Sequence, residues 1–242
     1  MEENAGVRQA VSSDGIDPLI LVNPHCFGQE EIPNSSEERA RVSQILQSRR
    51  AISVPHSSSH DRSSSSILIE ENDSPLFIHL AYGLAYTIGS ALGSRPPSEE
   101  TCLAAYVVPN KAGLTAGSRA WSKHSHRSLP IPSDAEEEDK QKCSAGWWGI
   151  PSGPVSVINE GSLRLFWKVM NDATWRNLHW LPHEVLVYKV RVAEGYGMRW
   201  SQDQADRPDS DGGEKTNWPW IFRGFVEPSM ENGHELKWRH PI

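Results

Sequence analysis

Residues 185–201 read VLVYKVRVAEGYGMRWS, and this stretch decides the fold class. Large apolar side chains fall on every second residue in both halves, first as Leu186, Tyr188, Val190 and Val192 and then as Tyr196, Met198 and Trp200. Alternation with a period of two is typical of a strand that buries one face. Ala193-Glu194-Gly195 separates the halves and has the composition of a turn. The stretch therefore predicts two antiparallel strands joined in a hairpin.

The sequence on either side of the hairpin continues the same domain. Trp220 to Glu227 is expected to form a further strand, and the region before the hairpin has helical spacing. The helical stripe consists of Leu163, Phe166, Trp167 and Met170, after Asn159 as the expected cap. All ten tryptophans lie between Trp121 and Trp238, and each can bury a large apolar area. We therefore expect an α+β fold: a mainly antiparallel sheet with helices packed on it and a Trp-rich core.

Two more elements are expected before residue 110. Ser74-Pro75 is a good helix start, because Ser caps a helix well and Pro fits its first position. A leucine-rich ridge then recurs every fourth residue as far as Leu92. The run from Leu76 to Gly93 carries no formal charge, but its polar residues favour a packed helix over a membrane span. Cys102 to Val108 is expected to be a strand.

Composition divides the chain into two parts. Residues 1–73 are expected to be a mostly flexible amino-terminal arm, with one helix at 36–50 and a Ser-rich linker. A capping box at Ser35-Ser36-Glu37-Glu38 and the basic Arg49-Arg50 at the other end support that helix. Residues 74–242 are expected to form a single α+β domain, with mobile acidic loops at 134–144 and 202–217.

Net charge and cysteine content restrict the function classes. The formal net charge of −7 argues against a dedicated nucleic-acid binder, for which a basic domain is usual. Three widely spaced cysteines without a Cys-x-x-Cys pair are typical of a reduced, intracellular protein. The acidic start Met1-Glu2-Glu3-Asn4 lacks the basic and apolar regions of a secretory signal. We therefore expect a cytoplasmic or nuclear protein with no membrane partner.

The first candidate site is the basic segment at residues 118–127. In an extended segment His124 and His126 would point to the same side, and either could exchange protons as the catalytic acid or base. The flanking cations are Arg119, Lys123 and Arg127, and Trp121 could stack on a base. A phosphate is the natural ligand of such a group. The alternative is a solvated basic loop.

The second candidate site is the segment from Arg176 to Glu184. His179 and His183 are four residues apart, the spacing of a helical zinc site, and Arg176 is expected to help bind a ligand. Pro182 lies between the two histidines and disfavours a helix, so we predict no metal ligands, with a zinc site shared by this pair and His124 and His126 as the alternative. The alternative is that one histidine bonds to the backbone while Trp180 packs the loop.

The third candidate site is a pair of arginines on two strands expected in one sheet. Arg199 lies opposite the Met198 and Trp200 face, and Arg223 is expected to share a face with Ile221, Phe225 and Glu227. If the two faces coincide, both guanidinium groups converge beside Glu227 and Glu231, which suits a carboxylate or phosphate ligand. An ordinary cross-strand ion pair is the alternative.

Together these sites predict an anion-binding cleft formed by the loop at 113–128, residues 176–184, Arg199 and Arg223. Its expected ligand is a phosphorylated small molecule, a nucleotide or a nucleic-acid end. If the protein is an enzyme, hydrolysis or phosphoryl transfer is the expected reaction class. The alternative is a non-catalytic protein–protein interaction or regulatory protein, with partners bound through the amino-terminal arm. No cofactor signature is complete, so the residues name no cofactor.

Overall fold

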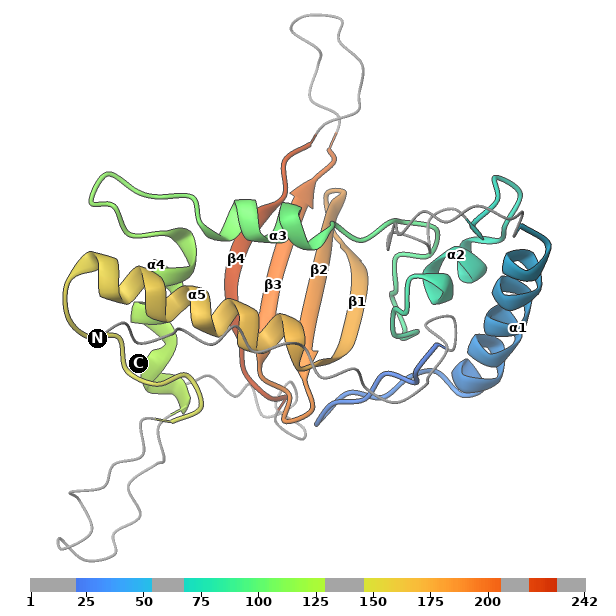
Figure 1. The fold of residues 1–242 in the computed structure, drawn as a ribbon, viewed down its shortest axis with the longest axis horizontal. Helices are drawn as coiled ribbons and strands as arrows, with labels where there is room; N and C mark the ends of the chain where they lie inside the picture. The colour runs from blue at the N-terminus through green and yellow to red at the C-terminus, as the bar shows by residue number, and fades with distance from the viewer. Residues whose placement is uncertain (1–20, 54–67, 129–145, 206–217, 230–242) are drawn as a thin grey trace, which may run out of the picture.

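The computed structural model describes residues 21–53, 68–128, 146–205 and 218–229. In these residues a four-stranded antiparallel sheet has the order β1-β2-β3-β4, and helices lie against it and beside it (Figure 1). The helices are α1 (Ser35–Ser53), α2 (Pro75–Ala81), α3 (Glu99–Tyr106), α4 (Ala116–His124) and α5 (Val155–Asn171), with a 3-10 turn η2 (Ser125–Ser128) after α4. The strands are β1 (Ala173–Leu181), β2 (Val185–Val192), β3 (Gly197–Asp203) and β4 (Ile221–Val226). The predicted α+β fold is confirmed.

The hairpin predicted from residues 185–201 is present as β2 and β3. Tyr188 lies opposite Trp200, and Val190 lies opposite Met198, so the large side chains of both strands share one face. That face, together with the core-facing side of β1, packs under α3 and α5 in Figure 1. We call it the core face.

The core is rich in tryptophan, as expected. Trp148 and Trp200 are both fully buried, and Trp200 Nε1 donates a hydrogen bond to the Cys102 carbonyl at 3.1 Å. Buried tryptophan needs such a partner for its N–H. The other large members of the cluster include Tyr106, Trp121, Phe166, Leu178, Tyr188, Met198, Phe222 and Phe225. One face of the sheet therefore packs in the hydrophobic core.

Two expected elements differ from the structure. Cys102–Val108 was expected to be a strand, but Ser98 accepts a hydrogen bond from the Thr101 N–H at 3.2 Å and starts helix α3 there. Cys102 and Tyr106 then face the core four residues apart. The expected long helix also stops at α2, because Gly83 takes a positive φ of 67° soon after its end. The ridge toward Leu92 is therefore not one helix.

The chain after α2 runs along the outer edge of β1. The Ala85 N–H donates to the Arg176 carbonyl at 2.7 Å, and the Ala91 N–H donates to the Leu178 carbonyl at 2.8 Å. These bonds satisfy an edge that would otherwise be unpaired. Within the described residues, no helix has the length and apolar character needed to cross a membrane.

Helices α1 and α2 pack together beside this edge through a second, smaller core that includes Leu46, Phe77 and Leu80. The predicted helix at 36–50 is present as α1. The predicted loop at 134–144 and the Ser-rich linker lie outside the described residues. Of the predicted loop at 202–217, residues 202 and 203 end β3 and residues 206–217 lie outside the described residues.

Candidate functional site

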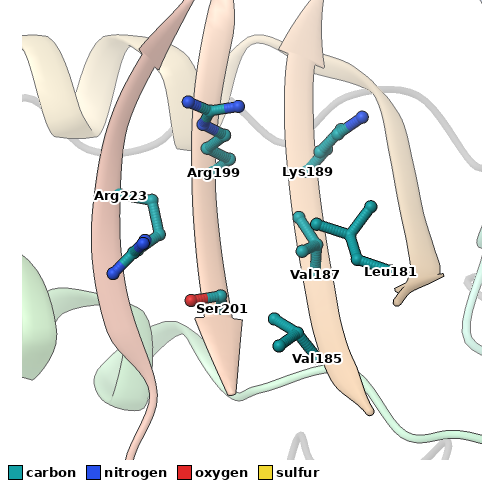
Figure 2. A pocket seen from close by; sticks show the side chains of 7 residues that line it. All are labelled: Leu181, Val185, Val187, Lys189, Arg199, Ser201 and Arg223. Carbon is teal, nitrogen blue, oxygen red and sulfur yellow. The ribbon is translucent and has the colours of Figure 1, made fainter. Parts of the chain in front are cut away.

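The sheet face turned away from α3 and α5 carries a cluster of positive side chains. A hollow of about 220 Å³ is lined there by Leu181, Val185, Val187, Lys189, Arg199, Ser201 and Arg223. Figure 2 shows that the three cations come from three adjacent strands, β2, β3 and β4. We call this the cationic face. No carboxylate is among these lining residues.

The pairing register of β2 with β3 places the first two cations side by side. Lys189 lies directly opposite Arg199, and Val187 lies opposite Ser201. Residues opposite each other in an antiparallel pair project to the same face. Their neighbours Tyr188 and Trp200 point into the core, so the alternation that builds the core also exposes the cations.

A β-bulge brings the third cation to the same face. In the β3–β4 pair Arg199 lies opposite Gly224, but Trp200 lies opposite Phe222, so Arg223 is an extra residue. Phe222 and Phe225 both pack in the core, whereas Arg223 between them turns to the cationic face. The prediction that Arg223 shares a face with Phe225 was wrong, because it assumed an unbroken strand.

Burial and like charge both act on Lys189. The pKa of Lys189 is lowered, first by burial and then by the positive charges of Arg191 and Arg199. Arg191 is itself buried, and its Nη1 donates to the Glu227 carbonyl oxygen at 2.9 Å. Like charges held together oppose one another, and an anion between them would relieve this repulsion. The face is therefore suited to an anionic ligand.

The β1 side of this face is closed by a polar network. Asn177 is fully buried, and its side chain donates to Thr87 Oγ1 at 3.0 Å and accepts from Ser90 Oγ at 3.1 Å. His179 Nε2 lies 3.3 Å from Thr87 Oγ1. Burial, followed by the charge of Lys189, lowers the pKa of His179 to about 4, so its imidazole is neutral at pH 7.

The expected pairing of His179 with His183 does not occur. His179 lies on β1, whereas His183 is exposed in the turn after it, with a positive φ of 63°. Arg176, also on β1, lies opposite Val190 and donates from Nη2 to the Met170 carbonyl at 3.1 Å. It therefore projects to the core side, away from Lys189. Across the described part of the chain, no group of three or more His, Cys, Asp or Glu residues could hold a metal ion.

The basic segment is helical rather than extended. Thr115 caps α4 by accepting from the Ser118 N–H at 3.1 Å, so the loop expected at 113–128 is mostly α4 and η2. The expected alignment of His124 with His126 on one side of an extended segment is therefore wrong. Arg119, Lys123 and His126 are exposed. The side chain of Arg127 lies outside what the structure describes.

Trp121 does not form a stacking platform. It is buried in the core, and its Nε1 donates to the Trp148 carbonyl at 3.0 Å. Gly161 on α5 leaves room for the ring, because a Cβ atom there would lie 2.9 Å from Trp121 Cζ3. Trp121 therefore joins α4 to α5 instead of facing a ligand.

His124 approaches the last residues of β4, but it is not among the residues that line the hollow. Its Nδ1 lies 3.3 Å from Glu227 Oε1, just past the end of β4. Its Nε2 would lie 4.0 Å from a Cβ atom on Gly224, the residue opposite Arg199. Of the predicted site residues, the structure thus groups Arg199 and Arg223 in one hollow, and His124 lies outside its lining.

One comparison with known proteins gives a match. Residues 105–207 match the family model of the CdiA C-terminal tRNase toxin domain. The match covers less than half of the 242-residue chain, from the end of α3 to just past β3. It includes His124, Lys189 and Arg199 but ends before Arg223. No curated protein and no solved structure matches the chain.

The match to a tRNase family overturns the expected function. A cleft for a phosphorylated small molecule, nucleotide or nucleic-acid end was predicted, as was a non-catalytic alternative, and the match supports neither. The net charge of −7 also hides a local concentration of positive charge on one sheet face. Only the coarse expectation of a nucleotide-containing, phosphorylated partner agrees with the match. Protein partners of the arm and a cytoplasmic or nuclear location stay predictions.

Proposed function

We propose that this chain is a ribonuclease that cleaves tRNA on the cationic face of its sheet. The observation that carries the proposal is the convergence of Lys189, Arg199 and Arg223 in one hollow. Lys189 and Arg199 lie inside the segment that matches the tRNase family model. A phosphodiester carries one negative charge, which becomes larger as a fifth oxygen approaches the phosphorus.

The three cations suit both binding and cleavage of a phosphodiester. A guanidinium group presents a planar fork of donors that matches two phosphate oxygens, and an ammonium group adds a compact charge. In RNA the 2′-oxygen can attack the adjacent phosphorus, so that a P–O2′ bond forms and the P–O5′ bond breaks. Cations fixed in advance near the phosphorus stabilise the extra charge of that transition state.

The rest of the hollow is apolar and lies beside the cations. Leu181, Val185 and Val187 line it on β1 and β2, and Leu181 is half exposed. Figure 2 shows these side chains beside Ser201 and the cations. A ribose or base next to the cleaved phosphate would contact this apolar side. Both chemical parts of a nucleotide thus have a complementary surface.

Cleavage of purified tRNA by the full chain tests the proposal. The wild type should cut tRNA but not a DNA oligonucleotide, because DNA has no 2′-hydroxyl, and one product should end in a 2′,3′-cyclic phosphate. Arg199→Ala and Arg223→Ala should each slow cleavage by about 10²-fold, the usual effect of losing one group that stabilises transition-state charge.

A matched control separates this site from general surface charge. Arg164 on α5 is exposed, pairs with Glu160 at 2.5 Å and is not among the residues that line the hollow. Arg164→Ala should cleave tRNA like the wild type. Wild-type protein that leaves tRNA intact would refute the proposal. Equal rates for Arg199→Ala, Arg223→Ala and Arg164→Ala would refute the assignment to the cationic face.

A further inference from the structure

We propose that Lys189 is the general acid of this cleavage reaction and that its ammonium group donates a proton to the 5′-oxygen as the P–O5′ bond breaks. This role rests on the proposed ribonuclease function and supplies a proton transfer that the two arginines of the hollow cannot provide. The geometry that carries it is the place of Lys189 in the lining, between the arginines and the apolar side chains.

The leaving oxygen needs a proton donor. Attack by the 2′-oxygen leaves a negative charge on the 5′-oxygen, and a sugar hydroxyl is a very weak acid, so protonation by a nearby group makes this oxygen a better leaving group. Arg199 and Arg223 line the hollow, but a guanidinium group keeps its proton in a protein. Ser201 offers only a hydroxyl, which is itself a very weak acid. Lys189 is therefore the lining residue that can release a proton.

Lys189 lies at the boundary between the charged and the apolar parts of the hollow. It is directly opposite Arg199, and Val187 lies two residues before it on the same strand and face. Figure 2 shows Lys189 and Val187 on β2, with Arg199 on β3 to one side and Leu181 to the other. The bridging oxygen of a phosphodiester joins the phosphorus to a ribose. A phosphate held by the arginines and a ribose on the apolar side would thus place this oxygen at Lys189.

Within the part of the chain that the structure describes, no carboxylate holds the ammonium group of Lys189. Asn177 lies opposite it on β1, but the Asn177 side chain bonds to Thr87 and Ser90. Arg191, two residues along β2, donates to the carbonyl oxygen of Glu227 rather than leaving that group for the lysine. The protons of the ammonium group are therefore available to a substrate.

The surroundings of Lys189 also make its ammonium group a stronger acid. Burial is the first cause that lowers its pKa, and the positive charges of Arg191 and Arg199 follow. Two further titratable or charged groups on this side of the sheet are His179 on β1 and Arg223 on β4. The pKa of His179 is about 4, so its imidazole is neutral at pH 7 and is not an effective donor there.

Protons and electrons balance over the proposed step. Hydroxide takes the proton of the 2′-hydroxyl and becomes water, while the 2′-oxygen forms its bond to phosphorus. The P–O5′ bond breaks with its electron pair on O5′, which takes a proton from the ammonium group of Lys189. The neutral amine then takes a proton from water and regenerates the hydroxide. No oxidant or reductant enters the step.

Lys189→Arg separates proton donation from positive charge. The variant keeps the charge, but its guanidinium group does not release a proton. We expect kcat for tRNA cleavage by the full chain to fall by about 10²–10⁴-fold. A tRNA with a 2′-deoxy sugar at the cleaved position should bind about as tightly as it binds the wild type. Lys168→Arg makes the same change at an exposed lysine outside the lining and should keep the wild-type rate.

A substrate with sulfur in place of the 5′-bridging oxygen tests the site of protonation. A thiolate leaves without a proton, because a thiol is a much stronger acid than a sugar hydroxyl. An RNA stem-loop that carries this sulfur at the mapped cut should therefore be cleaved by Lys189→Arg at nearly the wild-type rate. Arg199→Ala should stay slow on both substrates, because its loss affects the charge at phosphorus instead of the leaving group.

The pH profile gives a third measurement. The wild-type rate should rise with pH, because hydroxide removes the 2′-proton, and should level off as Lys189 loses its own proton. The slower Lys189→Arg protein should show no such levelling over the same range. Similar melting temperatures for both proteins would exclude a loss of folding as the cause of the difference.

These outcomes distinguish the role of Lys189 from the proposed function. If Lys189→Arg cleaves tRNA at the wild-type rate while Arg199→Ala does not, Lys189 supplies only charge, and the general-acid role fails while the ribonuclease stands. A folded Lys189→Arg protein that binds tRNA but gains nothing from the sulfur substitution would also overturn it. If the wild type does not cleave tRNA, both fall together.

Discussion

The two faces of the sheet use the same strands for different purposes. On β2, Leu186, Tyr188 and Val190 are buried under helices, while Lys189 projects to the opposite face beside Arg199. The core face offers apolar area whose burial stabilises the fold. The cationic face brings like charges together, which opposes folding but suits a polyanion. Stability and the proposed activity can therefore be changed separately, one face at a time.

The core face should give the largest effect on stability. Trp200 is fully buried against Tyr188 and Phe222, with ring centroids 6.1 and 5.4 Å away. Trp200→Ala should lower the free energy of unfolding by about 3–5 kcal/mol, because it leaves a large cavity. Trp180 is 44% exposed at the end of β1, so Trp180→Ala is a matched control and should lower the free energy of unfolding far less. Equal urea midpoints for the two variants would contradict the division between the faces.

The polar network beside β1 should show an intermediate effect. Asn177→Ala removes the hydrogen bonds to Thr87 and Ser90 and empties the fully buried centre of this network. We expect a loss of about 1–3 kcal/mol in the free energy of unfolding. Asn171, exposed at the end of α5, is the control and should change stability little when replaced by Ala. If Asn177→Ala is as stable as Asn171→Ala, this edge is not held by the network.

Removing a cation from the cationic face should raise the stability of the protein instead of lowering it. The native pKa of Lys189 is lowered by burial and by Arg191, so the unfolded chain binds its proton more tightly. The charged lysine therefore destabilises the native state at neutral pH. This penalty decreases as the pH rises through the native pKa toward the ordinary value near 10.4. Lys189→Met should raise stability by less than about 1 kcal/mol at pH 7.

Two measurements check this prediction. The gain from Lys189→Met, taken from urea midpoints, should be larger at pH 7 than at pH 10, and tRNA binding by the same variant should weaken. Lys168→Met on the surface of α5 is the matched control. The ammonium group of Lys168 lies over the Trp147 ring rather than beside other cations, so its loss should not raise stability. If Lys189→Met is less stable than the wild type at pH 7, the charged lysine does not destabilise the native state and the prediction is wrong.

The sequence correctly predicted the elements in which apolar residues recur at a single clear spacing. Alternation in 185–201 predicted the hairpin, and the same alternation placed Lys189 opposite the core side chains. The segment from Cys102 to Val108 failed because a short apolar run fits a strand or a helix equally well. Its cap at Ser98 was the signal that favours a helix. Local pattern was sufficient only where it was unambiguous.

The site was harder to predict because it depends on contacts between distant residues. Arg199 and Arg223 were correctly paired as a possibility, but the bulge at Arg223 depends on how β4 aligns with β3. The approach of His124 to Glu227 joins residues far apart in the sequence, and neither composition nor spacing indicates it. Lys189 and Ser201 were missed as lining residues, although the alternation placed both on the outer face.

The smallest effects are expected from the exposed cations of α4, which made the basic segment prominent in the sequence. Arg119 and Lys123 are exposed on the helix surface and do not line the hollow. Arg119→Ala and Lys123→Ala should change the free energy of unfolding by less than about 0.5 kcal/mol. Each should slow tRNA cleavage by no more than about twofold at 0.15 M salt, where exposed charges are screened beyond about 8 Å. A loss as large as that of Arg199→Ala would mean that tRNA contacts α4 as well as the sheet. Helix α4 would then belong to the binding surface rather than to the scaffold.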